Sequence, residues 1–389
     1  MARHEAALAR YGAARADTLP TVGAGAAITT NRQSNDRPLR GANQPDFYGA
    51  QTVGAGISAP VDIWAQLGDR ARAARAEATA DADDLAFARI ALEADLARRY
   101  VALRGLDAEG AILASAVKVY GEAVRVVRAR FATGTASGID LGRVEAQLAD
   151  AQAQLADIRG TRAVAEHAIA VLVGVQPAEL SIPIDVPPLR PLPIVAGVPA
   201  DVLQARADIA AAERRVYAAN RAIGVARAAW FPAITLGAAG GRQATTLAGL
   251  AAAPNLFWSL GPQMVLPLFD GGARRARVQE ARAQWREATA HYRATVLSAM
   301  AQVEDNLAQG RQLAGEVSAA DRAASAEASA ARLVYDRYIK GVASILDVVT
   351  AQGNELDLRR RAEHTRTRLL QTGITLREAL GDPAAIRDN

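Results

Sequence analysis

The chain of 389 residues contains no cysteine. It therefore has no disulfide framework, no thiolate zinc site and no catalytic cysteine nucleophile. Aromatic residues make up only 5% of the chain, although hydrophobic residues make up 50%. Alanine, the strongest helix former, supplies much of the difference. This composition favours thin layers of closely packed helices over a thick globular core.

Lysine is also scarce, because only Lys118 and Lys340 occur. The formal net charge of +4 therefore rests on arginines, which alternate with Asp and Glu at helical spacing. This pattern indicates solvated helix faces, whereas a nucleic-acid-binding protein would show a basic stripe or a known module.

Residue arrangements that carry chemistry are missing too. The four histidines are scattered without partner spacing, so we expect no metal site and no cofactor. The segment FDGG (269–272) lacks the Lys and Ser/Thr of a phosphate-binding loop, and its Asp270 is interpreted as a helix N-cap. Without a readable nucleophile–base pair, we predict that the protein is not an enzyme.

No run of about 18 apolar residues predicts a transmembrane helix. The N-terminal residues also lack the layout of a secretory signal. Taken alone, these absences would point to a cytoplasmic protein, but an internal repeat points elsewhere.

Two segments of the chain share one unusual pattern. RFATGTASGID (130–140) and RYIKGVASILD (337–347) both read Arg–aromatic–x–x–Gly–x–x–Ser–x–x–Asp, at an offset of 207 (337 − 130 = 207). Pro60 and Pro267 share this offset, and a Leu-Pro or Phe-Pro pair recurs at Pro20 and Pro232, at an offset of 212 (232 − 20 = 212). The sequence therefore predicts two tandem structural repeats.

Each repeat contains two Gly-rich segments of about ten residues, the length with which a tilted β-strand spans a bilayer. They cover 21–30, 50–60, 232–242 and 255–267. In the last one, Trp258, Leu260 and Met264 alternate with small or polar residues, a period of two that indicates a strand. We predict four membrane strands per chain, although the edge of a soluble β-sandwich would give a similar pattern.

Long helical sequence follows each strand pair. Residues 64–130 contain no proline, and at about 1.5 Å per residue they would reach about 100 Å; residues 273–338 repeat the pattern. Such helices fit a hairpin, the wall of a coiled-coil tube or a spectrin-like rod.

The repeated motif predicts a sharp reversal between two helices. Its glycines can adopt positive φ, its serines can cap the next helix, and its aspartates fall in the first turn of that helix, where the dipole favours a carboxylate. These pairs are Gly134 and Gly341, Ser137 and Ser344, and Asp140 and Asp347. A well-made turn explains most of the motif without requiring that it bind a partner.

Taken in order, these features resemble the outer-membrane factors of Gram-negative bacteria, the TolC-like channels, and among them the NodT/OprM-type efflux lipoproteins. The resemblance is carried by residues 198–236 and 259–308 and by the two turn motifs, and it covers essentially the whole chain.

The resemblance implies a mostly α protein with a small transmembrane β part, assembled as a homotrimer. Each chain would give four strands to a shared 12-stranded β-barrel in the outer membrane and helical hairpins to a periplasmic α-barrel. Independently, a four-stranded sheet leaves two edges that lipid cannot satisfy. This edge argument alone allows a dimer as well.

The function implied is the outer-membrane exit duct of a tripartite efflux system for drugs or other small molecules. Its partners would be a periplasmic adaptor and an inner-membrane pump of the RND or related type, in contact with outer-membrane lipid and with no nucleic acid. A type I secretion channel shares the fold, and a soluble helical scaffold or adaptor is the alternative from another class.

The resemblance also assigns roles to particular residues. The turns at Gly134, Ser137, Asp140, Gly341 and Ser344 would meet the adaptor. Asp347 matches an acidic residue at the closed periplasmic entrance, where a ring of carboxylates would favour cations. The second acidic position of this entrance falls on Thr350, which would weaken such a gate. A simpler role for Asp347 is that of an acid in the first turn of a helix.

Four aromatic residues flank the third and fourth strands and would form a belt at the membrane interface. They are Trp230, Phe231, Phe257 and Trp258. Ordinary core packing is the competing explanation.

The expected segments follow from the repeats and the resemblance. They are the tail of a truncated first-repeat helix (1–17), a strand pair (18–60), a helical hairpin (61–173), a Pro-rich connector (174–198), a second leading helix (199–230), a second strand pair (231–267), a second hairpin (268–381) and a C-terminal tail (382–389). The family normally begins with a signal peptide, usually a lipid-bearing Cys, and a longer first helix. We therefore expect an outer-membrane protein that extends into the periplasm but whose sequence is truncated at this end.

Overall fold

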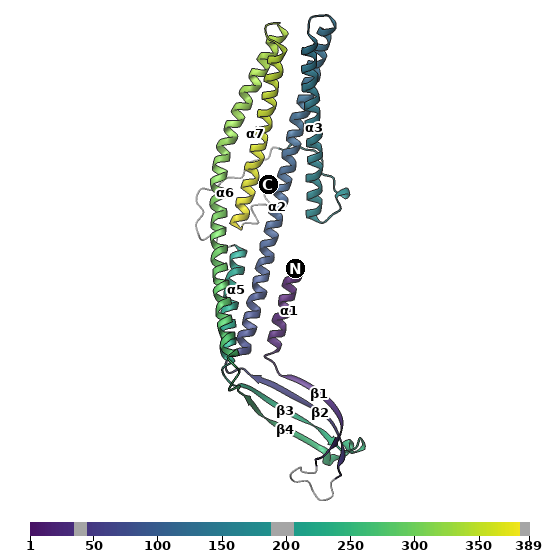
Figure 1. Cartoon of the computed structure of the whole chain (residues 1–389), viewed down its shortest axis with the longest axis vertical. Helices are drawn as coiled ribbons and strands as arrows, with labels where there is room; N and C mark the ends of the chain where they lie inside the picture. The colour runs from purple at the N-terminus through teal and green to yellow at the C-terminus, as the bar shows by residue number, and fades with distance from the viewer. Residues whose placement is uncertain (35–44, 188–205, 382–389) are drawn as a thin grey trace. The chain divides into compact units, whose positions relative to one another are not determined.

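The computed structural model describes residues 1–34, 45–187 and 206–381 (Figure 1). In the first repeat the elements are α1 (Ala2–Ala16), β1 (Thr21–Arg32), β2 (Phe47–Val61), α2 (Gln66–Ala132) and α3 (Gly138–Val173). In the second repeat they are α5 (Ala207–Ala228), β3 (Ala233–Ala244), β4 (Leu256–Val265), α6 (Ala273–Ile339) and α7 (Ile345–Leu380). Short 3₁₀ turns occur at η1 (Pro177–Glu179), η2 (Ala248–Ala251) and η3 (Ala253–Asn255).

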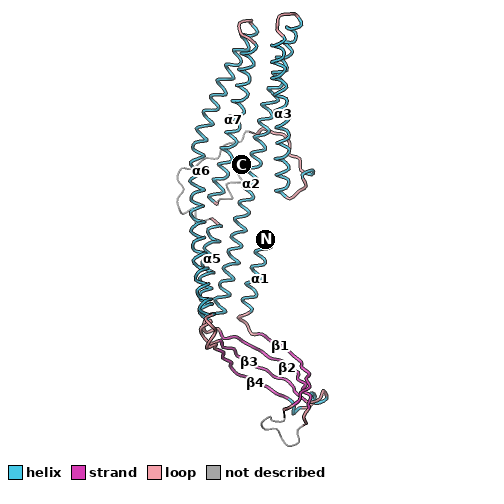
Figure 2. Tube along the Cα trace, in the orientation of Figure 1, coloured by secondary structure: helices cyan, strands magenta, loops and turns pink. Residues whose placement is uncertain are grey.

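The two repeats have matching elements. Helices α2 and α6 each contain 67 residues, and α3 and α7 each contain 36. The starts of the two long helices also differ by the same offset as the two motifs (273 − 66 = 207). The predicted mostly α fold with two tandem repeats and four strands is confirmed, and in the described part of the chain Figure 2 shows strand only in one small sheet.

Parts of three expected segments lie outside the described residues. They are 188–198 of the connector, 199–205 of the second leading helix, and the C-terminal tail 382–389. Residues 35–44 of the first expected strand pair (18–60) also lie outside the described residues.

The described residues fall into two compact units. The first contains the sheet and the helical segments within 1–85 and 208–295; the second contains the described parts of 86–207 and 296–389. The long helices α2 and α6 contribute to both.

The first unit is built on a four-stranded antiparallel sheet in the order β1-β2-β3-β4. Strands β2 and β3 come from different repeats and pair at its centre, with Ile57 opposite Ala238. Within the described residues β1 and β4 are the two edge strands. The pairing thus joins the first repeat to the second.

Helices of the first unit pack closely beside one another. His4 Nδ1 on α1 lies 3.2 Å from the carbonyl oxygen of Ala78 on α2. On α5, Gly224 lies so near α2 that a Cβ atom there would overlap the carboxylate of Asp69. The small residues Ala78 and Gly224 at these crossings allow the helices to approach closely.

The second unit consists of two helical hairpins, α2 with α3 and α6 with α7. Their shared core includes Leu113, Tyr120 and Leu356, which come from α2 and α7. The Tyr120 hydroxyl donates to the carbonyl oxygen of Gln352 at 3.1 Å, and burial raises the pKa of Tyr120 to about 12.

A buried ionic network fastens the chain that follows α3. The Asp107 side chain is fully buried and accepts from Arg104 at 2.8 Å and from Arg162 at 2.6 Å. The same two arginines donate to the carbonyl oxygens of Pro183 and Ile182, at 2.8 and 2.6 Å. This part of the expected connector is therefore fixed to the first hairpin.

Among the described residues, the helices that are long enough to cross a membrane are not sufficiently apolar to do so.

Candidate functional site

The two motif turns have the same backbone structure. Gly134 and Gly341 have φ of +75° and +78°, a left-handed conformation that glycine adopts without steric cost. The amide of Thr135 donates to the carbonyl oxygen of Arg130 at 2.8 Å, and the amide of Val342 donates to that of Arg337 at 2.9 Å. The repeated sequence pattern therefore encodes a repeated turn.

Each turn ends in a capping box. The amide of Asp140 donates to Ser137 Oγ at 3.1 Å, and the amide of Ser137 donates back to Asp140 Oδ2 at 3.1 Å. Ser344 and Asp347 make the same reciprocal pair, at 3.2 and 3.0 Å. The expected capping role of both serines is confirmed.

The two turns lie at the same end of the second unit. Their helices share a hydrophobic cluster, and the Arg130 guanidinium lies 4.7 Å from the ring centre of Tyr338. The cluster contains Val124, Val127, Val144, Tyr338, Ile345 and Val348. Figure 1 shows the loops after α2 and α6 at one end of the two hairpins, so the structure brings the two copies of the motif together.

Asp347 and Thr350 are both exposed, one helical turn apart, whereas Val348 between them is buried. The Ser344 hydroxyl donates to the Asp347 carboxylate at 2.8 Å. This bond, the Ser344 backbone amide and the charge of Arg337 lower the pKa of Asp347 below its ordinary value of 3.8. The carboxylate therefore caps α7 and remains ionised at neutral pH.

The two faces of the sheet differ strongly. Strand register and alternation place large apolar side chains on one face, which we call the apolar face. They are Val22, Ile28, Val53, Ile57, Val61, Leu236, Leu256, Trp258, Leu260 and Met264, each between 42% and 77% exposed. An apolar surface of this kind marks contact with lipid or with a partner.

The opposite face, which we call the small-residue face, carries glycines and short polar side chains. Thr21, Gly23, Gly56, Ser58, Thr235, Gly237, Ser259, Gly261 and Gln263 all help to line a hollow of about 640 Å³. One face is therefore suited to hydrocarbon and the other to water.

The predicted aromatic residues separate into two groups. Trp230 and Phe231 precede β3 at one end of the sheet, and Phe257 and Trp258 lie at the other end, where Trp258 is opposite Gly240. Trp258 projects from the apolar face and is 77% exposed, whereas neighbouring Phe257 alternates onto the small-residue face.

Sequence reasoning missed Trp64. Its ring stacks on Phe231 with centroids 4.5 Å apart, and its Nε1 donates to the carbonyl oxygen of Pro232 at 3.0 Å. Arg274 lies 5.0 Å from the centre of the neighbouring Trp230 ring. A tryptophan between a strand and a helix was the available signal, but both of its partners belong to the other repeat.

Asp270, the expected N-cap, accepts from the amides of Gly272 and Arg274, both at 3.0 Å. The side chain of Arg274 also donates to this carboxylate at 2.7 Å. These hydrogen bonds and the positive charge of Arg274 lower the pKa of Asp270. Asp270 thus satisfies the amide of Arg274 in the first turn of α6 and the amide of Gly272 just before the helix.

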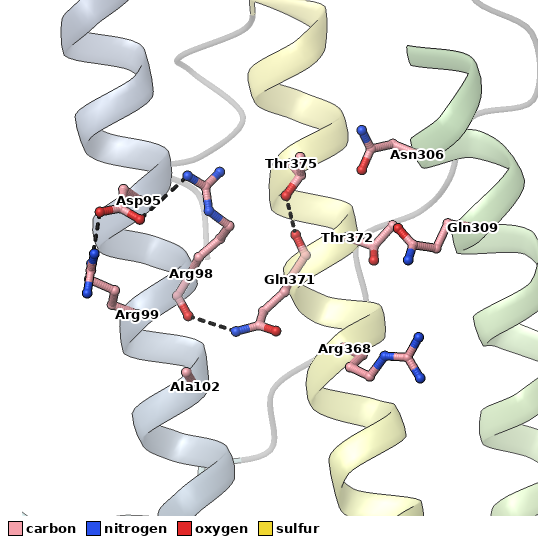
Figure 3. Close-up of a pocket in the computed structure, with 10 residues that line it drawn as sticks. All are labelled: Asp95, Arg98, Arg99, Ala102, Asn306, Gln309, Arg368, Gln371, Thr372 and Thr375. Atoms are coloured by element: carbon pink, nitrogen blue, oxygen red, sulfur yellow. Dashed lines mark hydrogen bonds and ion pairs between the residues drawn. The ribbon is translucent and has the colours of Figure 1, made fainter. Parts of the chain in front are cut away.

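A polar pocket of about 500 Å³ lies between α2, α6 and α7 (Figure 3). Among its side chains Asp95 pairs with Arg98 and Arg99, and Gln371 donates to the carbonyl oxygen of Arg98 at 3.3 Å. The residues that line the pocket include no His, Cys, Ser or Tyr.

Comparison with known proteins identifies the family. The model of the outer membrane efflux protein family matches residues 1–175 and 198–382. Outer membrane protein OprJ of Pseudomonas aeruginosa is 32% identical over 356 residues, which cover 90% of this chain and 73% of OprJ. The toluene efflux pump outer membrane protein TtgF of Pseudomonas putida is 30% identical over 370 residues, covering 94% of this chain and 76% of TtgF.

The fold agrees with these sequence matches. The crystal structure of the outer membrane protein VceC from Vibrio cholerae superimposes with a TM-score of 0.90 at 27% identity, covering 98% of this chain and 91% of VceC. The chain therefore belongs to the outer membrane efflux protein family and is an outer-membrane efflux channel protein with the TolC-like fold.

Proposed function

We propose that three copies of this chain close into one duct, through which drugs or other small molecules leave the cell. The sheet carries this proposal, since it combines two edges with one apolar and one small-residue face. Lipid offers no hydrogen-bond partners to an open edge, and single-chain barrels need at least about eight strands. Closure by further copies satisfies both edges, and the resemblance to TolC-like channels favours three.

In the closed duct the apolar face contacts lipid and the small-residue face lines the lumen. Trp230, Phe231 and Trp64 lie at one end of the sheet and Trp258 at the other, as two interfacial belts would require. We propose that these aromatics mark the two surfaces of the membrane.

The motif turns form the docking end. They are paired at one end of the second unit, and their exposed residues include Val342 and Ile139, which are 62% and 70% exposed. A periplasmic adaptor would contact this surface and connect the duct to an inner-membrane pump of the RND or related type.

Asp347 and Thr350 form the proposed periplasmic gate. Their exposure leaves them free to face other copies, and the lowered pKa of Asp347 keeps its charge. We expect Asp347→Ala to change single-channel conductance and reduce cation preference. Asp140→Ala is the matched control, because it removes the same cap in the first repeat. Unchanged conductance and selectivity in Asp347→Ala would contradict the gate.

The cargo proposed is small molecules. TtgF is named for toluene efflux, and a wide duct leaves most selectivity to the pump. The matching family and its relatives are named for efflux, which supports transport without catalysis.

Channel formation tests the proposal directly. The purified protein, inserted into planar bilayers, should give repeated conductance steps of uniform size. Absence of any conductance from protein extracted from outer membranes would contradict it.

A further inference from the structure

The contact between the two repeats of one chain provides a template for the contact between copies. Strand β2 of the first repeat pairs with β3 of the second, and in a closed ring β4 would pair with β1 of the next copy. The second repeat of one copy would then lie beside the first repeat of the next copy. The loops and helices beside these strands would meet in the same order. This reasoning rests on the closed ring proposed above.

Inside the chain, the loop after β2 packs on the junction before β3. Trp64 stacks on Phe231 and donates to the carbonyl oxygen of Pro232. The counterparts of Phe231 and Pro232 in the first repeat are Leu19 and Pro20, because the two Pro junctions align (232 − 20 = 212). Leu19 is 55% exposed, and Phe231 keeps 48% exposure even beside Trp64, so Leu19 offers an apolar surface comparable to the one on which Trp64 stacks.

The loop after β4 corresponds to the loop after β2. Ala65 and Gly272 both have positive φ, +56° and +93°, and their numbers differ by the same offset as the two motifs (272 − 65 = 207). Gly271 stands at the place of Trp64 and has no side chain to stack. The large apolar side chains of this loop are instead Leu268 and Phe269, which are 88% and 90% exposed.

The helices beside the sheet provide a second, independent observation that indicates the same contact between copies. Gly224 on α5 is crowded by Asp69 of α2, but its counterpart Gly12 on α1 (224 − 12 = 212) has no neighbouring atom within 4 Å of a Cβ placed there. In a ring, the helix arriving at Gly12 would be α6 of the next copy. Glycine at this position allows the same close approach.

We propose that Phe269, with Leu268, seats on Leu19 and Pro20 of a neighbouring copy, while α6 packs against Gly12 of that copy. This contact would repeat the one that Trp64 makes with the Pro232 junction inside the chain.

Charge does not repeat across the proposed contact. Asp69 and Asp81 pair with Arg221 and Arg215 inside the chain. Their counterparts on α6 are Ala276 (276 − 69 = 207) and Ala288 (288 − 81 = 207). The interface between copies therefore depends on apolar contact and close helix packing, and it should be insensitive to salt.

Cross-linking tests the proposed contact between Phe269 and Leu19 of a neighbouring copy directly, because the chain has no cysteine of its own. The double variant Leu19→Cys with Phe269→Cys, extracted from outer membranes in detergent, is treated with a short bifunctional maleimide. We expect most chains to move to a band of three linked copies. The pair Trp64→Cys with Phe231→Cys should link within one chain, and Phe269→Cys with Leu247→Cys should not link copies.

The outcomes separate the two proposals. If the protein has the mass of three copies before treatment and yet gives no linked product from Leu19→Cys with Phe269→Cys, this result overturns the proposed contact between Phe269 and Leu19. It leaves the proposed duct intact. Untreated protein that has the mass of one copy overturns the closed ring itself.

A substitution on helix α1 tests the proposed packing of α6 against Gly12. Gly12→Leu should abolish the oligomer without loss of helical circular dichroism, since a side chain at Gly12 meets nothing within its own chain. Gly142→Leu on α3 is the control, being equally open, and should leave the oligomer unchanged. A Gly12→Leu protein with the wild-type mass would contradict the packing of α6 at this position.

Discussion

At the scale of single residues, the two motif turns keep their backbone hydrogen bonds while their side chains differ. Thr135 and Val342 are chemically unlike, but their amides bond to equivalent arginine carbonyls at 2.8 and 2.9 Å. Both turns require glycine, because the left-handed conformation of Gly134 and Gly341 is costly for other residues.

Substituting the turn glycine should therefore destabilise the hairpin. We expect Gly341→Ala to lower the free energy of unfolding by about 1–2 kcal/mol, because alanine is strained at φ of +78°. Gly142→Ala, inside α3, should instead raise stability by about 0.5–1 kcal/mol. Denaturant unfolding of both variants provides the measurement, and equal effects would contradict this account of the turn.

The cap of α7 should respond to acid. The folded pKa of Asp347 is lowered, chiefly by its bond from Ser344. Its contribution to stability is therefore complete above the unfolded pKa of 3.8 and is lost as pH falls through the folded pKa. Wild type should melt at a higher temperature than Asp347→Asn at neutral pH, and this difference should vanish once the pH falls below the folded pKa of Asp347. A difference that persists in acid would exclude this linkage.

At the scale of elements, the alternation of side chains along each strand made the two faces of the sheet predictable. Contacts between residues far apart in the sequence could not be predicted in this way. Leu260 and Ser259 fall on opposite faces because side chains alternate along any strand. Trp64 stacks on Phe231, and no local pattern indicates that contact. The Asp107 network likewise joins helices α2 and α3 through Arg162, which helical periodicity cannot reveal.

The faces of β4 give a matched test of lipid contact. Leu260→Arg puts a charge on the apolar face and should cost about 2–4 kcal/mol if the residue lies near the membrane midplane. Ser259→Arg, one residue away on the small-residue face, should be tolerated. Unfolding in lipid vesicles measures both, and a more harmful Ser259→Arg would reverse the assignment of the faces.

The ionic network that fixes residues 182–185 of the connector to the first hairpin, which we call the clamp, should depend on the Asp107 carboxylate. Asp107→Ala leaves Arg104 and Arg162 buried without their shared partner, which typically costs about 3–5 kcal/mol. Asp95→Ala removes a more exposed carboxylate that pairs with Arg98 and Arg99 and should cost at most about 1 kcal/mol. Proteolysis near residues 182–185 should increase only in Asp107→Ala; equal protection in both variants would contradict the clamp.

At the scale of the whole molecule, repetition predicted more than composition did. The absence of cysteine and of apolar helices pointed to a cytoplasmic protein, whereas the recurring turn motif and Pro junctions led to the correct fold. Membership of the outer membrane efflux protein family excludes the soluble scaffold considered at the outset. The number of copies could not be derived from the sequence, because the edges of one sheet require closure without specifying how many chains provide it.

The mass of the detergent-extracted protein tests the central claim most directly. Light scattering corrected for bound detergent should give three times the chain mass of 40.8 kDa, from protein recovered only with the outer membrane. A single 40.8 kDa chain that stays in solution without detergent would contradict the account, because its sheet would then keep both edges and its apolar face in water.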